Sequence, residues 1–128
     1  MVKYCVLLIL LIFASCDFLG GGCSDEFKMV TLEIFDINDE PVILDRFETI
    51  SLASGKVYDI SEYYSSYPSS GIYPVLTDSQ KQDVQKNGTK FQFLGYFDDQ
   101  LVVSEKFLIM RGRCHIGSED DQRIVIIE

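Results

Sequence analysis

The sequence contains no tryptophan, a single histidine and three prolines. Because His115 is the only imidazole, any catalytic or metal site that needs two histidines is excluded. Basic residues are also scarce: 11 lysines and arginines stand against 20 aspartates and glutamates, giving a net charge of −9. A field of this sign repels polyanions, which excludes nucleic acid as a partner. It also predicts that the folded part stands away from anionic lipid headgroups.

The sequence has no hydrophobic run long enough to cross a bilayer. Val6–Ala14 is uninterrupted by polar residues for nine positions, about half of the roughly 20 that a spanning helix requires. This is the length of a signal-peptide core, and Lys3 supplies the basic start. We therefore predict that residues 1–15 are a signal peptide that is removed on export.

The end of this run carries a more specific motif. Phe13-Ala14-Ser15-Cys16 resembles the lipobox of bacterial lipoproteins, in which small residues precede the cysteine that is lipidated. The resemblance implies a diacylglycerol thioether and an acylated amine on Cys16, and attachment to the bacterial outer membrane on its periplasmic or outer face. A single acyl chain binds a membrane only marginally, whereas several anchor it stably. The alternative is a plain secretory signal with an incidental cysteine.

Residues 16–26 are predicted to form a lipidated, flexible tether. Gly20–Gly22 give the backbone maximal freedom, and the polar residues that follow are poorly suited to a core. Ser24-Asp25-Glu26 resembles the acidic patch near the lipidated cysteine that directs lipoproteins of the Bacteroides type to the cell surface.

Only two of the four cysteines are predicted to be available for a disulfide. Cys5 leaves with the signal peptide and Cys16 is assigned to the lipid, so Cys23 and Cys114 remain. Export permits a disulfide between them. However, Cys23 lies in the predicted tether, which would have to fold back over the domain, so we expect a free Cys114 and keep the disulfide as the alternative.

The remaining residues, 27–128, form one domain in which hydrophobic residues recur at every second position. Val30, Leu32 and Ile34 alternate with more polar neighbours, as in a strand with one buried face. Leu101, Val103, Phe107 and Ile109 do the same in a later segment. The predicted strands are 30–35, 42–52, 57–60, 73–76, 90–97, 100–110 and 123–127.

Turn and helix signals separate these strands. Asn38–Pro41 and Asp98-Asp99 predict hairpin turns. Thr77–Lys86 predicts the one short helix, with an N-cap at its start, Val84 as its apolar contact and Asn87-Gly88 as its stop. Together these elements predict a mainly β fold, an antiparallel β-sandwich of about seven strands.

Two partial family resemblances support this fold class. Val30–Val42, VTLEIFDINDEPV, is similar to the opening hairpin of transthyretin-like or carboxypeptidase-regulatory-like domains. Gly71–Asp78, the Phe91-x-Phe93-x-Gly95-Tyr96 segment and Cys114-His115-Ile116 together resemble small lipoproteins of the Bacteroides type. The second resemblance implies an immunoglobulin-like or transthyretin-like sandwich and no particular activity.

Candidate catalytic and metal-binding residues give little support for chemistry. Adjacent side chains on an extended chain point to opposite faces, so Cys114 and His115 are predicted to lie in the core and at the surface, respectively. Asp36–Glu40 has alternating oxygen ligands but lacks the glycine and distal glutamate of a calcium loop, and we predict a turn. We find no Ser–His–Asp set, and we predict a non-enzymatic protein without metal or cofactor.

The most informative polar segment is Ser61–Gly71, which is rich in serine and tyrosine. Tyr63, Tyr64, Tyr67 and the nearby Tyr73 offer flat amphipathic rings that suit protein or glycan binding; the alternative is that these rings pack on the sheet. The sequence therefore predicts a binding or structural module anchored to the membrane through Cys16. An inhibitor or immunity-type partner of a secreted enzyme, or a carbohydrate-binding accessory protein, is the alternative.

Overall fold

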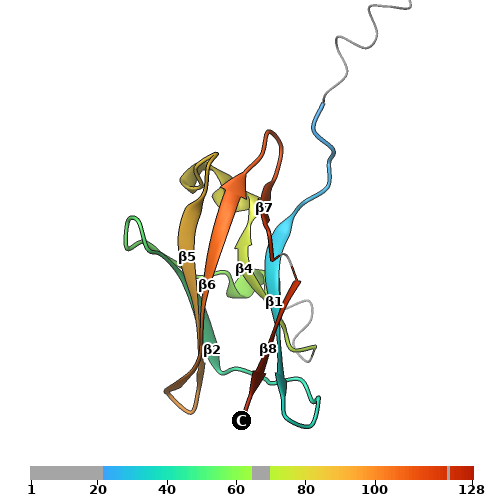
Figure 1. The fold of residues 1–128 in the computed structure, drawn as a ribbon, viewed down its shortest axis with the longest axis vertical. Coiled ribbons are helices and arrows are strands. Elements are labelled where there is room, and N and C mark those ends of the chain that lie inside the picture. The colour runs from blue at the N-terminus through green and yellow to red at the C-terminus, as the bar shows by residue number, and fades with distance from the viewer. Residues whose placement is uncertain (1–21, 65–69, 121) are drawn as a thin grey trace, which may run out of the picture.

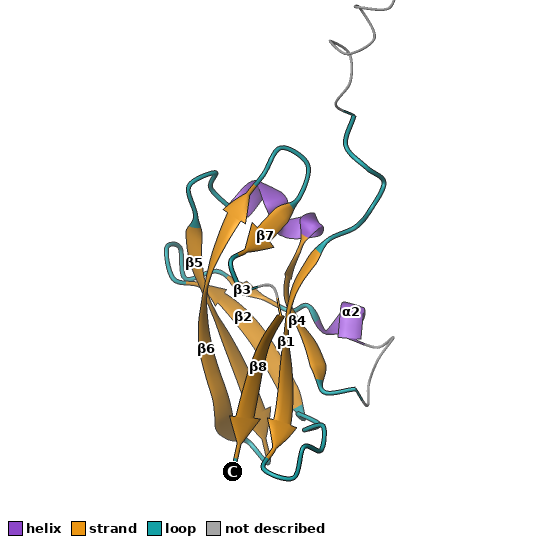
Figure 2. Cartoon of the chain, turned by 45° about the vertical axis from the view of Figure 1, so that its right-hand side comes forward, coloured by secondary structure: helices purple, strands orange, loops and turns teal. Residues whose placement is uncertain are grey.

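The computed structural model describes residues 22–64, 70–120 and 122–128, and shows two β-sheets packed face to face (Figures 1 and 2). This confirms the predicted mainly β, sandwich-like fold. The strands in the described residues are β1 (Met29–Asp36), β2 (Arg46–Ser51), β3 (Val57–Tyr58), β4 (Ile72–Thr77), β5 (Thr89–Phe97), β6 (Gln100–Arg111), β7 (Ile116–Ser118) and β8 (Gln122–Ile127).

One sheet has the strand order β4-β1-β8 and the other the order β3-β2-β5-β6-β7. All neighbouring strands are antiparallel except β1 and β8, which run parallel from the Thr31–Gln122 pair to the Asp36–Ile127 pair. The expectation of a purely antiparallel sandwich is therefore wrong at this one pair.

The core lies between the two sheets and follows the period-two pattern of the sequence. Val30, Leu32 and Ile34 of β1 are at most 1% exposed and face the buried aromatic residues of the other sheet. These aromatic residues are Phe47, Phe91, Phe93 and Phe107. In the described part of the chain, every buried core residue lies after residue 29.

The segment after β1 does not return beside β1 as the predicted hairpin strand 42–52. Asp36 Oδ1 accepts hydrogen bonds from the backbone N–H groups of Asn38 and Glu40, which closes the predicted turn. After a single bridge between Phe35 and Pro41, the chain crosses to the other sheet and forms β2 there. The partner of this strand was thus predicted wrongly, although the turn itself is confirmed.

The hydroxyl of Tyr73 holds this crossing segment. It donates to the carbonyl of Val42 at 2.6 Å and accepts the N–H of Leu44 at 2.8 Å. Tyr73 itself is fully buried in β4. Tyr73, which lies 29 positions after Leu44, therefore holds the point at which the chain leaves the first sheet. Local turn chemistry does not reveal this long-range contact.

The helix predicted at 77–86 is a shorter 3-10 helix, η1 (Asp78–Asp83). Thr77 caps it through a capping box with Gln80, as the N-cap prediction required. It ends early because Val84 is extended and 1% exposed, filling the core. A second short helix, α2 (Ser61–Tyr64), lies within the segment predicted as loop.

The hairpin between β5 and β6 turns at Asp98 and Asp99, as predicted. Both residues have positive φ angles, 48° and 60°, as a two-residue hairpin turn of matching twist requires. A register shift follows, so that Gly95 pairs with Val103 but Tyr96 pairs with Leu101. Leu101 is consequently 52% exposed rather than in the core.

Candidate functional site

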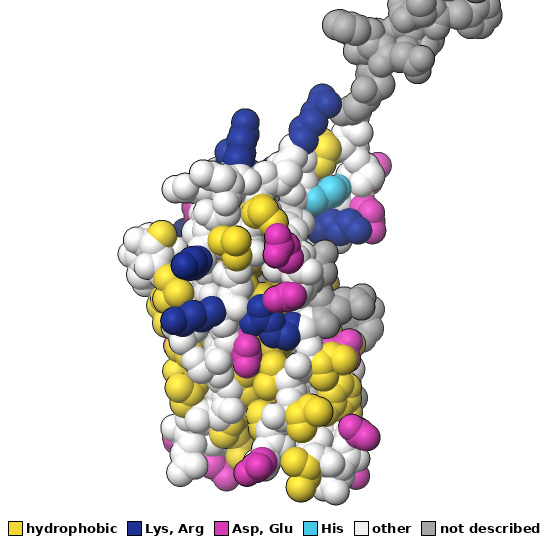
Figure 3. Space-filling model, viewed as in Figure 1, with side chains coloured by type: hydrophobic (Ala, Val, Ile, Leu, Met, Phe, Trp, Pro, Cys, Tyr) yellow, Lys and Arg dark blue, Asp and Glu magenta, His cyan; other side chains and the backbone are white. Residues whose placement is uncertain are grey.

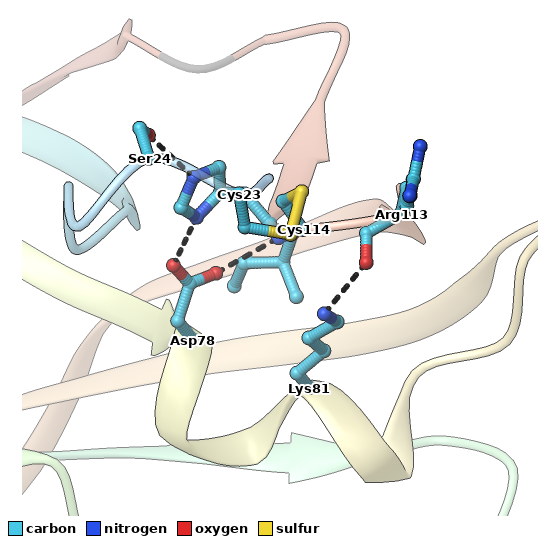
Figure 4. Close-up of a disulfide and its surroundings, with 8 residues drawn as sticks. Cys23, Ser24, Asp78, Lys81, Arg113 and Cys114 are labelled. Atoms are coloured by element: carbon cyan, nitrogen blue, oxygen red, sulfur yellow. Dashed lines mark hydrogen bonds and ion pairs between the residues drawn. A yellow bond between two sulfur atoms is a disulfide. The ribbon is translucent and has the colours of Figure 1, made fainter. Parts of the chain in front are cut away.

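Three segments that are distant in the sequence meet at the end of the sandwich from which residues 22–28 leave (Figures 1 and 4). Cys23 and Cys114 form a disulfide there, with Cα atoms 5.3 Å apart and a sequence separation of 91. The expectation of a free Cys114 in the core is wrong, because Cys114 is only half-buried and pairs with Cys23.

Asp78 is the centre of this arrangement. It follows β4 directly and begins η1, so the capped turn at Thr77 fixes its backbone. Its Oδ1 accepts the N–H of Ile116 and its Oδ2 accepts the N–H of Lys28, both at 2.9 Å. Burial raises the pKa of this carboxyl, but the hydrogen bonds from Ile116, Lys28 and His115 outweigh burial and leave the pKa below its usual value of 3.8.

His115 connects Asp78 to the segment that precedes β1. Its Nδ1 lies 2.6 Å from Asp78 Oδ2, and its Nε2 lies 3.1 Å from Ser24 Oγ. With Asp78 ionised, Nδ1–H donates to the carboxylate, and in the neutral imidazole Nε2 accepts from the Ser24 hydroxyl. His115 is 22% exposed, so the prediction of a surface histidine is only partly met.

Ser24, His115 and Asp78 have the connectivity of a nucleophile, a base and an orienting acid. The prediction that the chain holds no such set is therefore wrong at the level of hydrogen bonds. Hydrolysis further needs donors aimed at the developing oxyanion and a pocket for the substrate. The cavity of about 310 Å³ beside His115 is lined by residues 110, 112 and 115–119 and not by Ser24. These three side chains, together with the Cys23–Cys114 disulfide and the Lys28 N–H, are called the clamp below.

The clamp shows that part of the predicted tether is bound to the domain. Cys23 is covalently bonded, Ser24 binds His115, and the Lys28 N–H binds Asp78. Residues 23–26, which were predicted to belong to the flexible tether, are thus held against the domain. Six residues separate Cys23 from Cys16 in the sequence, and Cys16 itself lies outside the described residues.

Next to the clamp lies a basic groove of about 540 Å³. Lys81, Lys86, Arg111 and Arg113 line it together with Gly112, and we call it the basic groove below. The Lys81 ammonium donates to the Arg113 carbonyl at 2.9 Å, which ties η1 to the loop that carries Cys114. In Figure 4 the Arg113 guanidinium points away from the disulfide. None of the four cations forms a salt bridge with a carboxylate in the described part of the chain.

Three acids of the domain are paired with residues outside the basic groove. Asp83 Oδ2 accepts from the Lys56 ammonium at 2.9 Å and from the Tyr58 hydroxyl at 2.8 Å. Asp78 binds Lys28, His115 and Ile116. Asp120 pairs with Arg123 at 2.7 Å. On the face in Figure 3, the Lys and Arg side chains lie in the half nearer this end, where Asp and Glu side chains lie among them, and the opposite half carries hydrophobic and acidic side chains.

Two of the four tyrosines predicted to contact a ligand, Tyr63 and Tyr73, pack within the domain. Tyr63 is half-buried against the core, its ring stacks on Phe27 at 5.6 Å, and its hydroxyl lies 2.8 Å from Ser79 Oγ. Tyr73 is a core residue, so its prediction as a ligand contact is wrong. The Tyr64 side chain and Tyr67 lie outside the described residues. For Tyr63 and Tyr73, packing on the sheet is therefore the correct alternative.

The outer face of the three-stranded sheet exposes a group of aliphatic side chains. Ile124 and Ile126 of β8 are 61% and 63% exposed, and Ile72 of β4 is 39% exposed. β8 is also an edge strand with β1 as its partner. Sequence analysis missed this surface, because the run Ile124–Ile127 does not show which of its two faces is buried.

No protein-family model, curated protein or solved structure matches this chain. Across the described ranges, no helix has the length and hydrophobicity to cross a membrane. The same residues contain no cluster of three or more His, Cys, Asp or Glu side chains placed to hold a metal ion.

Proposed function

We propose that this protein is a lipid-anchored envelope protein, attached through Cys16 and acting as a non-enzymatic binding or structural module. The observation that carries the proposal is the hydrophobic run that ends in Phe13-Ala14-Ser15-Cys16. The Cys23–Cys114 disulfide supports it, because disulfides persist in oxidising compartments outside the cytosol. The resemblance to Bacteroides-type lipoproteins points to the outer membrane.

Within this proposal, a protein partner is favoured over a glycan. Tyr63 and Tyr73 have packing roles, which removes two of the four rings proposed to stack on a sugar. Exposed aliphatic residues on the outer sheet face, Ile72, Ile124 and Ile126, suit a protein surface better. The inhibitor or immunity-type role is therefore the second candidate and the carbohydrate-binding role the third.

Metabolic labelling with palmitate tests the anchor. The full chain expressed in a Gram-negative host is expected to incorporate the label and to fractionate with membranes. Cys16→Ser is expected to abolish incorporation, whereas Cys23→Ser, the matched control, retains it. An unlabelled wild-type chain that still carries residues 1–15 would refute the proposal.

An active-site probe tests the non-enzymatic part of the proposal. A fluorophosphonate reacts with serines that a neighbouring base activates. Because Ser24 does not line the cavity beside His115, we expect no labelling of the purified protein. Labelling that Ser24→Ala and His115→Ala both abolish would show that the clamp is a nucleophilic centre.

A further inference from the structure

The basic groove lies beside the point at which the chain leads towards its proposed anchor. Arg113 precedes Cys114, which is bonded to Cys23, and Lys81 binds the Arg113 carbonyl. Six residues separate Cys23 from Cys16, so a fully extended connection spans about 24 Å. If Cys16 is embedded in a bilayer, this length keeps Cys23, and with it the loop of Arg113 and Cys114, near the headgroups.

We infer that the basic groove binds the anionic phosphate headgroups of the bilayer that holds Cys16, and thereby fixes the orientation of the domain on the membrane. This inference rests on the proposed anchor and adds a second contact to it. Four cations around one groove, free of salt bridges to described carboxylates, match the phosphate groups that lipid surfaces present.

Part of the negative charge of the chain lies far from the groove, whereas Asp25, Glu26 and Glu119 lie at the same end of the sandwich as the groove. The turns at the far end, around Asp36–Glu40 and Asp98-Asp99, and the end of β8 lie opposite the groove (Figure 1). The 12 residues of β6 run between the two ends, a length of about 40 Å at ~3.4 Å per residue. The Debye length at physiological ionic strength is only about 8 Å, so the far acids are screened from the groove.

This inference runs against the expectation from composition that the domain stands away from an anionic bilayer. That expectation treated the charge as uniform, whereas the structure gathers four cations around one groove at the end where residues 22–28 leave the domain. A domain of net negative charge with such a groove is attracted to an anionic surface through the groove and repelled elsewhere. The far-end turns and the outer face of the β4-β1-β8 sheet then remain available to a partner.

Co-sedimentation with vesicles tests the inference without using the lipid anchor. Residues 22–128 contain all core residues of the described structure and both cysteines of the disulfide, so this part is tested on its own once its cooperative unfolding and its disulfide are confirmed. We expect it to bind phosphatidylcholine vesicles that contain about one third phosphatidylglycerol, and not phosphatidylcholine alone. Because the anchor is absent, the result does not depend on whether Cys16 is lipidated.

Two charge variants of equal composition make the test specific. Lys86→Gln with Arg113→Gln removes two exposed cations of the groove, and we expect a loss of roughly fivefold per charge, or about 25-fold in the partition coefficient. Arg46→Gln with Lys106→Gln removes one arginine and one lysine away from the groove and is expected to change binding less than about twofold.

Three results would overturn the inference. The first is equal binding to neutral and anionic vesicles, and the second is equal loss in both double variants. The third is saturable binding of inorganic phosphate, measured by calorimetry, without binding to anionic vesicles, which would make the groove a site for a soluble anion. A chain that fails palmitate labelling but binds anionic vesicles through the groove would refute the anchor alone.

Discussion

Asp78 joins three segments through one carboxylate. Two backbone N–H groups and one imidazole bind its oxygens, so the N-terminal segment, η1 and β7 depend on the same side chain. No local pattern predicts this, because Ser24, Asp78 and His115 are separated by dozens of residues and are ordinary polar residues in sequence. The pairing of Cys23 with Cys114 was also ambiguous in the sequence. Two cysteines in an exported chain permit a disulfide, but only the fold brings their Cα atoms together.

Replacing Asp78 is expected to change the acid stability of the domain. Its folded-state pKa lies below the ordinary 3.8, so the ionised carboxylate stabilises the fold above that pH. This contribution is lost as the pH falls through the folded-state pKa. We expect Asp78→Asn to cost about 1–3 kcal/mol of unfolding free energy near neutral pH, and the gap to wild type to narrow below pH 3.8.

Urea unfolding at a series of pH values between neutral and strongly acidic measures this difference. Asp98→Asn in the far turn is a control with the same chemical change, and its unfolding curves are expected to follow those of the wild type. A constant gap between Asp78→Asn and wild type at all pH values would contradict the role assigned to the ionised carboxylate.

At the scale of elements, period-two alternation predicted the strands but not their partners. β5 and β6 pair as predicted because a two-residue turn joins them and restricts their register. β2 was assigned to the wrong sheet, since the Tyr73 hydroxyl decides where the crossing segment leaves β1. β7 was not predicted, because three residues are too few to show a period. In β8, the consecutive aliphatic residues Ile124–Ile127 do not reveal from the sequence which face of the strand is buried.

Two neighbouring isoleucines in β8 test which face is buried. Ile127 packs against the core, whereas Ile126 is 63% exposed on the outer face. We expect Ile127→Ala to lower the free energy of unfolding by about 1–2 kcal/mol and Ile126→Ala by less than about 0.5 kcal/mol. Thermal and urea unfolding measure both, and the reverse order would show that β8 is paired with β1 in a different register.

On the scale of the whole molecule, one covalent bond links the start of the folded chain to its β6–β7 loop. The Cys23–Cys114 disulfide spans 91 residues, and closing so long a loop restricts the unfolded state strongly. The same bond places the basic groove beside the tether. Composition gives the net charge of the chain, but the grouping of four cations around one groove follows from the fold.

Removing this bond is expected to destabilise the domain by about 2–5 kcal/mol. Cys23→Ser, Cys114→Ser and the double variant are expected to lose the same amount, since each removes the same bond. Unfolding of the wild type in the presence of a reductant is expected to match them. Additive losses in the double variant would mean that the two cysteines contribute separately rather than as a disulfide.

The central claim is that the chain is anchored at Cys16 and clamped to its own domain at Cys23, and mass spectrometry of the membrane-extracted protein tests both parts at once. After proteolysis without reductant, we predict an N-terminal peptide that begins at Cys16, carries the mass of the lipid, and remains joined through Cys23 to the peptide that contains Cys114. A chain that begins at Met1 without lipid, or free thiols on both Cys23 and Cys114, would contradict the account.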